Sequence, residues 1–129
     1  MNVDIADALS HSQLVDITTT GRRSGQPRRI EIVLHRLDDG LFISGMPRPQ
    51  KRAWLANLEA DPRMTLHLKG SFIADLPASA RVITDDAERR RVMPAIARAW
   101  NRTDVDVMVR HSPLIEVLVA EPRQGSAAA

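Results

Sequence analysis

Alternation of apolar and polar residues over short segments predicts a domain built mainly from β-strands. In the clearest segment, Ile30, Ile32 and Leu34 occupy alternate positions, the period of a half-buried strand. The turn sequence Asp38-Asp39-Gly40 follows and is typical of a hairpin that leads into a strand at 41–44. Further strands are expected at 14–20, 64–69, 72–76, 80–83 and 114–119.

Two segments have helical spacing instead. Apolar residues, including Trp54, recur every three or four positions between 50 and 60. A longer helix, capped by Thr84 or Asp85, is expected to run towards Trp100, with Pro94 kinking or dividing it. Shorter helical segments are expected at 2–9 and 104–110.

Hairpins interrupted by two helices, rather than strands alternating with helices, favour a small antiparallel barrel of the α+β class over a Rossmann fold. The chain has 129 residues, which suits one domain with one main site. We expect this domain to span 1–123 and a flexible tail to span 124–129.

Composition excludes several kinds of chemistry. The chain has no cysteine, so disulfides, thiolate catalysis and cysteine-ligated metals are excluded, and redox chemistry would need a bound cofactor. Its formal net charge is only +2, which by itself does not favour nucleic acid. The N-terminal segment is acidic, unlike a signal peptide, and no apolar stretch is long enough to span a membrane. We therefore expect a cytoplasmic protein.

Sequence motifs for metal, nucleotide and hydrolase sites are lacking. None of the four histidines has a second histidine at metal-ligand spacing, and no GxGxxG, GxxxxGK[ST] or GxSxG sequence occurs in the required context. His35 and His67 lie on the strand faces opposite the aliphatic residues. We expect both to face solvent and leave them out of the site.

The segment 21–29 holds four arginines and two glycines between two expected strands. Glycine lets a backbone approach a ligand closely, Ser24 can donate a hydrogen bond, and arginine matches the oxygens of phosphate or carboxylate. The segment is therefore either an anion-binding loop or a solvated turn.

A second basic cluster, Arg48, Lys51 and Arg52, precedes the helix that carries Trp54. Positive charge at a helix N-terminus opposes the helix dipole unless an anion lies nearby. If the fold brings both clusters together, seven cationic side chains could line one groove for a polyanionic ligand. By contrast, the acidic and basic residues at 85–91 are interpreted as a solvated helix face with intrahelical pairs.

Three ordered motifs cover nearly the whole chain: TTTGRRSGQPR at 18–28, WLANLEADP at 54–62, and an apolar strand that ends in Glu121-Pro122. With these motifs the chain resembles the deazaflavin-dependent nitroreductase family, the split-barrel oxidoreductases of actinobacteria that use coenzyme F420. The resemblance implies a split β-barrel of about six strands, related to the flavin-binding pyridoxine phosphate oxidases.

The same resemblance implies hydride transfer from the reduced deazaflavin to a small acceptor such as a quinone, nitro compound or activated alkene. It assigns the first loop to the phosphate and polyglutamate tail of the coenzyme, and Ser44 to a position close to the ring and the acceptor, as the one candidate catalytic residue. The implied cofactor-binding residues are Arg22, Arg23, Ser24, Gly25, Arg28, Ser44, Gly45, Met46, Arg48, Lys51, Trp54 and Asn57.

The chain departs from the family pattern at three points. Glu31 replaces a proline and would repel an anionic cofactor if it faced the groove, and the usual glycine pair is reduced to Gly45-Met46. The chain has no tyrosine, so nitroimidazole reduction is not carried over. Two alternatives stay open: a barrel that binds flavin mononucleotide, and a non-catalytic module for an anionic ligand. We expect no metal and no nucleic acid partner, and either a monomer or a homodimer.

Overall fold

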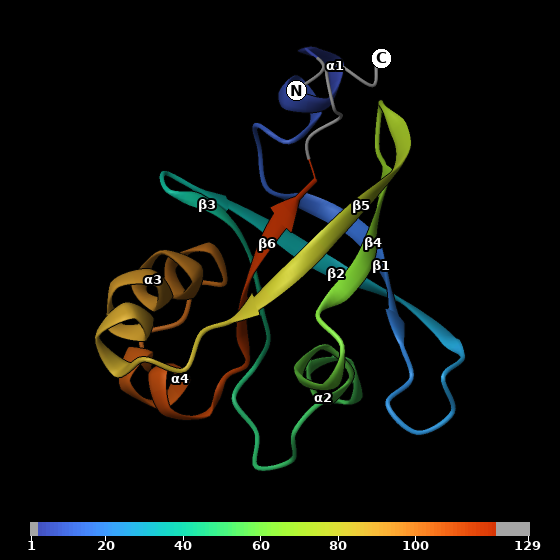
Figure 1. Ribbon diagram of the computed structural model, residues 1–129. Helices are drawn as coiled ribbons and strands as arrows, with labels where there is room; N and C mark the ends of the chain where they lie inside the picture. Colours follow the sequence, from blue (N-terminus) through green and yellow to red (C-terminus); the bar gives the residue numbers. More distant parts are fainter. Residues whose placement is uncertain (1–2, 121–129) are drawn as a thin grey trace.

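Six antiparallel strands form a closed barrel in the computed structural model, which describes residues 3–120 (Figure 1). Neighbouring strands follow the order β1-β2-β3-β6-β5-β4 around the barrel. This confirms the predicted antiparallel barrel of the α+β class. The strands are β1 (Gln13–Thr20), β2 (Pro27–Leu37), β3 (Gly40–Ser44), β4 (Arg63–Lys69), β5 (Ile73–Val82) and β6 (Leu114–Val119).

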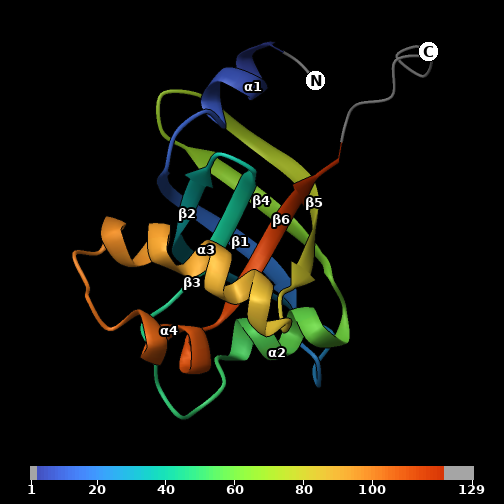
Figure 2. The same ribbon diagram turned by 90° about the vertical axis from the view of Figure 1, so that its left-hand side faces the viewer.

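Helices cover one side and both ends of the barrel. In two perpendicular views, α1 lies at one end and α2 at the other, while α3 and α4 pack together against one side (Figure 1, Figure 2). The end with α2 also holds the loop that joins β1 to β2. The helices of the described residues are α1 (Val3–Ala8), α2 (Ala53–Ala60), α3 (Asp86–Ala99) and α4 (Val105–His111).

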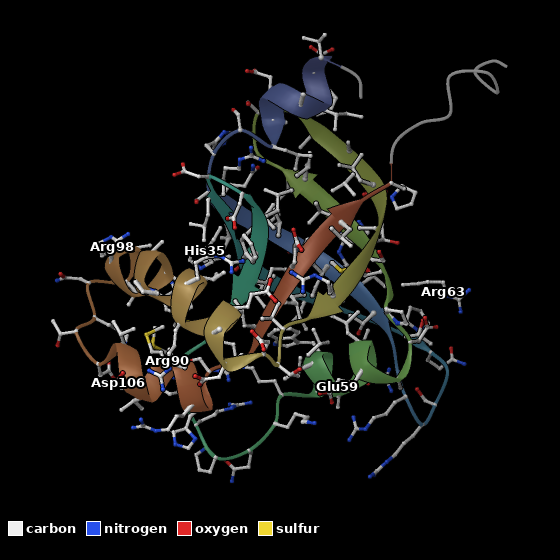
Figure 3. All side chains as sticks on the ribbon, turned by 60° about the vertical axis from the view of Figure 1, so that its left-hand side comes forward. His35, Glu59, Arg63, Arg90, Arg98 and Asp106 are labelled. Carbon is white, nitrogen blue, oxygen red and sulfur yellow. The ribbon has the colours of Figure 1, made fainter. Side chains whose placement is uncertain are left out.

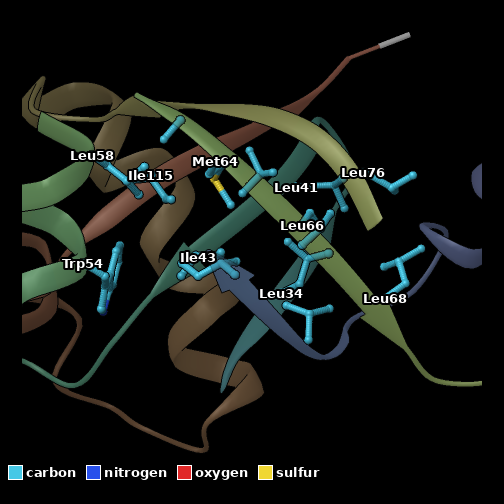
Figure 4. Close-up of a cluster of buried hydrophobic side chains, with 14 of the residues drawn as sticks. Leu34, Leu41, Ile43, Trp54, Leu58, Met64, Leu66, Leu68, Leu76 and Ile115 are labelled. Carbon is cyan, nitrogen blue, oxygen red and sulfur yellow. The ribbon is translucent and has the colours of Figure 1, made fainter. Parts of the chain in front are cut away.

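The barrel interior holds one of two apolar clusters. Ile17, Leu34 and Leu66 point inward from three strands and are fully buried, as the alternating pattern predicts. Trp54 and Leu58 of α2 belong to the same cluster (Figure 4). Burial of each such side chain stabilises the fold by about 1.5–3 kcal/mol, so α2 is firmly anchored over its end of the barrel.

A second apolar cluster lies between the barrel and the pair α3 and α4. Phe42 and Leu114 meet Met93, Ile96 and Met108 there. Arg89 of α3 crosses the rim of this cluster and donates hydrogen bonds to the carbonyl oxygens of Ile83 (2.8 Å), Val109 (2.7 Å) and Ser112. The prediction of a wholly solvated helix face is therefore wrong at this arginine, which ties α3 to α4.

The expectation that two strand histidines face solvent is also wrong. His35 is 1% exposed because Trp100 lies against its ring, with 5.0 Å between the ring centroids. His67 is 7% exposed, its Nε2 2.6 Å from the Thr18 hydroxyl oxygen and its Nδ1 2.7 Å from a carboxylate oxygen of Asp75. Both do lie on the outer strand faces, but neighbouring elements and side chains cover them.

Several element boundaries differ from the sequence prediction, and strand β2 already begins at Pro27, within the expected loop at 21–29. The expected strands at 72–76 and 80–83 are one continuous strand, β5, because Pro77 keeps its place opposite Thr65 of β4. Helix α2 begins at Ala53, three residues after the expected start. Helix α3 runs through Pro94 undivided, and Asp85 caps it by accepting a hydrogen bond from the Glu88 amide at 2.9 Å.

The expected tail at 124–129 lies outside the described residues. Within 3–120, none of the helices combines the length and hydropathy needed to cross a membrane.

Candidate functional site

The arginine-rich loop connects the paired ends of β1 and β2, where Thr20 lies opposite Pro27. The loop closes on itself: the Gly21 amide donates to the Gln26 carbonyl and the Gly25 amide donates to the Gly21 carbonyl, both at 2.8 Å. Gly25 has a φ of 71°, a conformation that favours glycine. This tight turn leaves the arginine side chains outside the loop.

Asn57 of α2 ties this loop to the helix. Its side chain is 4% exposed; its Oδ1 accepts a hydrogen bond from the Arg22 amide at 3.0 Å, and its Nδ2 donates to the Thr19 hydroxyl at 3.1 Å. Both ends of the amide are therefore satisfied. Because α2 is itself anchored in the core through Trp54, Asn57 fixes the position of the loop relative to the barrel.

A groove of about 520 Å³ lies between this loop and the start of α2. Five of the seven cationic side chains of the two basic clusters line it, so the fold brings the clusters together. Arg29 instead pairs with Asp16 at 2.9 Å, and Lys51 pairs with Glu59 at 2.6 Å. The lining residues are Thr19, Gly21, Arg22, Arg23, Ser24, Arg28, Ile30, Arg48, Arg52, Ala53, Trp54 and Asn57.

The charge of this groove is unbalanced. No aspartate or glutamate lines it, and no ion pair joins Arg22, Arg23, Arg28 or Arg48 to an acidic group among residues 3–120. Uncompensated guanidinium groups that share one concave surface repel one another and favour an anion between them. The groove therefore suits a polyanion better than a neutral ligand.

Arg52 is a groove residue that the implied list of cofactor-binding residues left out, although it belongs to the second basic cluster of the sequence. Its guanidinium lies against the backbone of Gly45, so close that a Cβ at that position would come within 2.7 Å of it. It donates a hydrogen bond to the Met46 carbonyl at 2.7 Å. Burial, and then the charge of Arg48, lower the pKa of Arg52.

A second cavity, of about 430 Å³, adjoins the groove and shares Ile30, Arg52 and Trp54 with it. One wall is the edge of β2: the ladder with β3 covers only His35–Leu37, so the preceding part of that edge is unpaired in the described structure. Its peptide groups can hydrogen-bond a ligand. The lining residues are Ile30, Glu31, Ile32, Val33, Ser44, Gly45, Met46, Arg52, Trp54 and Trp100. We name this the edge cavity.

Glu31 lies on the wall of the edge cavity and is absent from the lining of the basic groove. Its carboxylate forms an ion pair with Lys69, which also contacts Asp16 at 2.8 Å. The negative charge of Glu31 is thus partly balanced by a lysine of β4.

Three predicted residues use their polar groups within the protein or lie apart from both cavities. Ser44 lines the edge cavity, but it is 4% exposed and its hydroxyl donates to the Pro113 carbonyl at 2.6 Å. Lys51 and Gly25 line neither cavity. Among residues 3–120, no group of three or more histidine or acidic side chains is placed to hold a metal ion.

Solved structures of low sequence identity share this fold. A conserved hypothetical protein from Mycobacterium tuberculosis matches with a TM-score of 0.71 and 19% identity, over 94% of this chain and 81% of that one. The haem storage protein HutZ from Vibrio cholerae matches with a TM-score of 0.68 and 13% identity, over 92% and 89%. A FAD-binding protein from Mesorhizobium loti matches with a TM-score of 0.64 and 13% identity, over 94% and 91%.

These likenesses confirm the split-barrel fold. No curated protein sequence matches the chain. The model of one protein family, F420H2-dependent quinone reductase, matches residues 1–122, which is almost the whole chain. The chain therefore belongs to the F420H2-dependent quinone reductase family.

Proposed function

We propose that this protein binds reduced coenzyme F420 across the basic groove and the edge cavity and reduces a small electron-poor acceptor, in the first instance a quinone. Family membership supports the reaction class. The observation that carries the proposal for this chain is the basic groove itself, where five arginines converge and, within residues 3–120, no acidic side chain joins the lining. A coenzyme with a phosphate and several carboxylates supplies the missing negative charge.

The residues present fit such a coenzyme. Arg22, Arg23, Arg28 and Arg48 would hold the phosphate and the first tail carboxylates through charge-assisted hydrogen bonds. The ring end would lie in the edge cavity, where apolar side chains such as Trp54 and the unpaired edge of β2 offer both packing and peptide hydrogen bonds. Asn57 would act as a positioning residue, since it holds the loop in place.

When bound, the reduced deazaflavin supplies a hydride. The chain must then orient the acceptor, exclude water and stabilise the negative charge that develops on it. Arg52 is the cation at the junction of the two cavities and takes the electrostatic role in this proposal. Ser44 would still lie beside the acceptor, but its hydroxyl donates its hydrogen to the Pro113 carbonyl. We therefore assign Ser44 the structural role of holding the end of β3 in place.

Neighbouring arginines of β2 provide a matched test. Arg28 lines the groove, whereas Arg29 points to the opposite face and pairs with Asp16. Because a hydrogen bond to a charged group contributes about 1.5–3 kcal/mol, Arg28→Ala should weaken coenzyme binding by roughly 10- to 100-fold. Arg29→Ala should leave it within about twofold, the range of a peripheral surface charge.

The measurement is the oxidation of the reduced coenzyme by menadione, together with fluorescence titration of the oxidised coenzyme. A rise in the coenzyme KM and Kd for Arg28→Ala alone supports the proposal. Equal effects of the two substitutions, or no quinone-dependent oxidation by the wild-type protein, would contradict it.

Flavin mononucleotide is the alternative cofactor that the same assay separates. It carries a single phosphate, which two or three of the five arginines can satisfy. The remaining cations would then stay uncompensated, so we expect flavin mononucleotide to bind more weakly than the long-tailed deazaflavin. Tighter binding of flavin mononucleotide would replace the deazaflavin in this proposal.

A further inference from the structure

Another basic cavity, of about 200 Å³, lies on the far side of the segment that carries Arg48 and Arg52. Its walls come from the segment that leads into α2 and from the end of α4, which are far apart in the sequence. We name it the α2–α4 cavity. Its lining residues are Arg48, Pro49, Gln50, Lys51, Arg52, Leu55, Arg110, His111, Ser112 and Pro113.

Positive charge is in excess here as well. Arg48 and Arg110 form no ion pair with an acidic group among the described residues, and no acidic residue lines the cavity. The acidic side chains of the α4 region are engaged elsewhere: Asp104 pairs with Arg102, and Asp106 lies 3.3 Å from Arg90 of α3 (Figure 3). Nothing on α4 therefore neutralises Arg110.

The walls of the α2–α4 cavity combine this charge with apolar surface from Leu55, Pro49 and Pro113. Carboxylates carried on short aliphatic chains match such a surface, because methylene groups can pack on the apolar wall while the carboxylates meet the guanidinium groups. The cavity also shares Arg48 and Arg52 with the basic groove, so one ligand can reach both.

We propose that the α2–α4 cavity is a subsite for an aliphatic carboxylate arm of the ligand held in the basic groove, with Arg110 as its principal anchor. This inference rests on the proposed function. The carboxylates have two sources, the glutamyl tail of the coenzyme or a carboxylate on the acceptor, and the experiment separates them.

The test compares Arg110→Ala with Arg98→Ala. Both arginines are exposed and occupy the last turn of a helix, but Arg98 belongs to α3 (Figure 3) and lines none of the three cavities. Titration with the long-tailed coenzyme and with its tail-less analogue gives two dissociation constants for each variant. If the tail occupies the cavity, Arg110→Ala weakens binding of the long-tailed form about 5- to 10-fold and of the tail-less form less than twofold. Arg98→Ala changes neither.

A substitution that is expected to tighten binding, rather than weaken it, complements this test. Glu59 holds the Nζ of Lys51 at 2.6 Å, so Glu59→Gln releases this lysine towards the cavity. We expect Glu59→Gln to tighten binding of the long-tailed form about twofold.

The acceptor is examined with menadione and a carboxylated naphthoquinone. If the acceptor occupies the cavity, Arg110→Ala raises the KM of the carboxylated quinone alone and leaves both coenzyme constants unchanged. Either pattern supports the subsite and identifies its occupant. If Arg110→Ala behaves like Arg98→Ala both in the coenzyme titrations and in the quinone assays, the inference is overturned.

A probe without the deazaflavin keeps this result separate from the proposed function. Tri-γ-glutamate alone should shift the backbone amide resonances of Leu55 and His111 in the wild-type protein and much less in Arg110→Ala. If the wild type binds neither coenzyme form but these resonances still shift, the proposed function fails while the subsite stands. If the coenzyme does not bind and the resonances do not move, both fail.

Discussion

Replacement of Asn57 by alanine should remove the hydrogen bonds that hold the arginine-rich loop against α2. The substitution removes the acceptor of the Arg22 amide and the donor to the Thr19 hydroxyl, two hydrogen bonds of 3.0 and 3.1 Å in a site where Asn57 is 4% exposed. Each bond contributes about 1 kcal/mol, and a peptide N–H left without a partner adds to the loss, although water can reach the partly buried Arg22 amide. We expect the free energy of unfolding to fall by about 2 kcal/mol.

For a domain of this size such a loss lowers the Tm by about 6–10 °C. Urea denaturation followed by circular dichroism measures the free energy, and a cycle with Thr19→Val isolates the bond between the two side chains. We expect Thr19→Val to cost about 1 kcal/mol and the double variant to cost less than the sum, with a coupling of about 0.5–1 kcal/mol. A loss below about 0.5 kcal/mol for Asn57→Ala, or strictly additive losses, would refute this role of Asn57.

Three further predictions concern stability. Arg89→Ala should lower the free energy of unfolding, measured by urea denaturation, by about 2–3 kcal/mol, because three carbonyls lose a charged donor. Substitution of the exposed Arg90 by alanine should change this free energy little. Equal effects of the two substitutions would contradict the role of Arg89. Burial lowers the pKa of His35, so the unfolded chain binds the proton more readily and stability should fall as the pH drops below about 6.5. His35→Leu should flatten that slope, and an unchanged slope would argue against it. Arg63 lowers the pKa of Asp61 to about 2, so this carboxylate stabilises the fold above about pH 4 and loses its effect as the pH falls towards 2. An NMR titration midpoint near 4 for Asp61 would contradict the pairing.

The barrel could be predicted from the sequence because its interior obeys a simple period. Ile30, Ile32 and Leu34 alternate in the sequence, and in the structure Leu34 is buried in the interior cluster while the two isoleucines pack against it. The same rule failed for His35, because alternation assigns a residue to the outer face but does not say whether a distant helix covers that face. The contact with Trp100 joins positions 65 residues apart, which no local pattern contains.

Part of the candidate site could also be predicted from the sequence. The two basic clusters are local features of the sequence, and they meet because the arginine-rich loop and the start of α2 lie at the same end of the barrel. Arg28 and Arg29 show the limit: these neighbouring arginines of one cluster differ in surroundings, because a strand directs successive side chains to opposite faces. The α2–α4 cavity needed the structure, since only the packing of α4 places Arg110 and Arg48 around one cavity.

The central claim is that the basic groove holds a polyanionic deazaflavin coenzyme. Parallel titrations of the wild-type protein with oxidised coenzyme F420, flavin mononucleotide and haem test it most directly, with fluorescence as the readout for the first and absorbance for the others. We expect saturable binding of coenzyme F420 at micromolar concentration, weakened by added salt, and weaker binding of the other two. No saturable binding of coenzyme F420, or a preference for flavin mononucleotide or haem, would contradict the account.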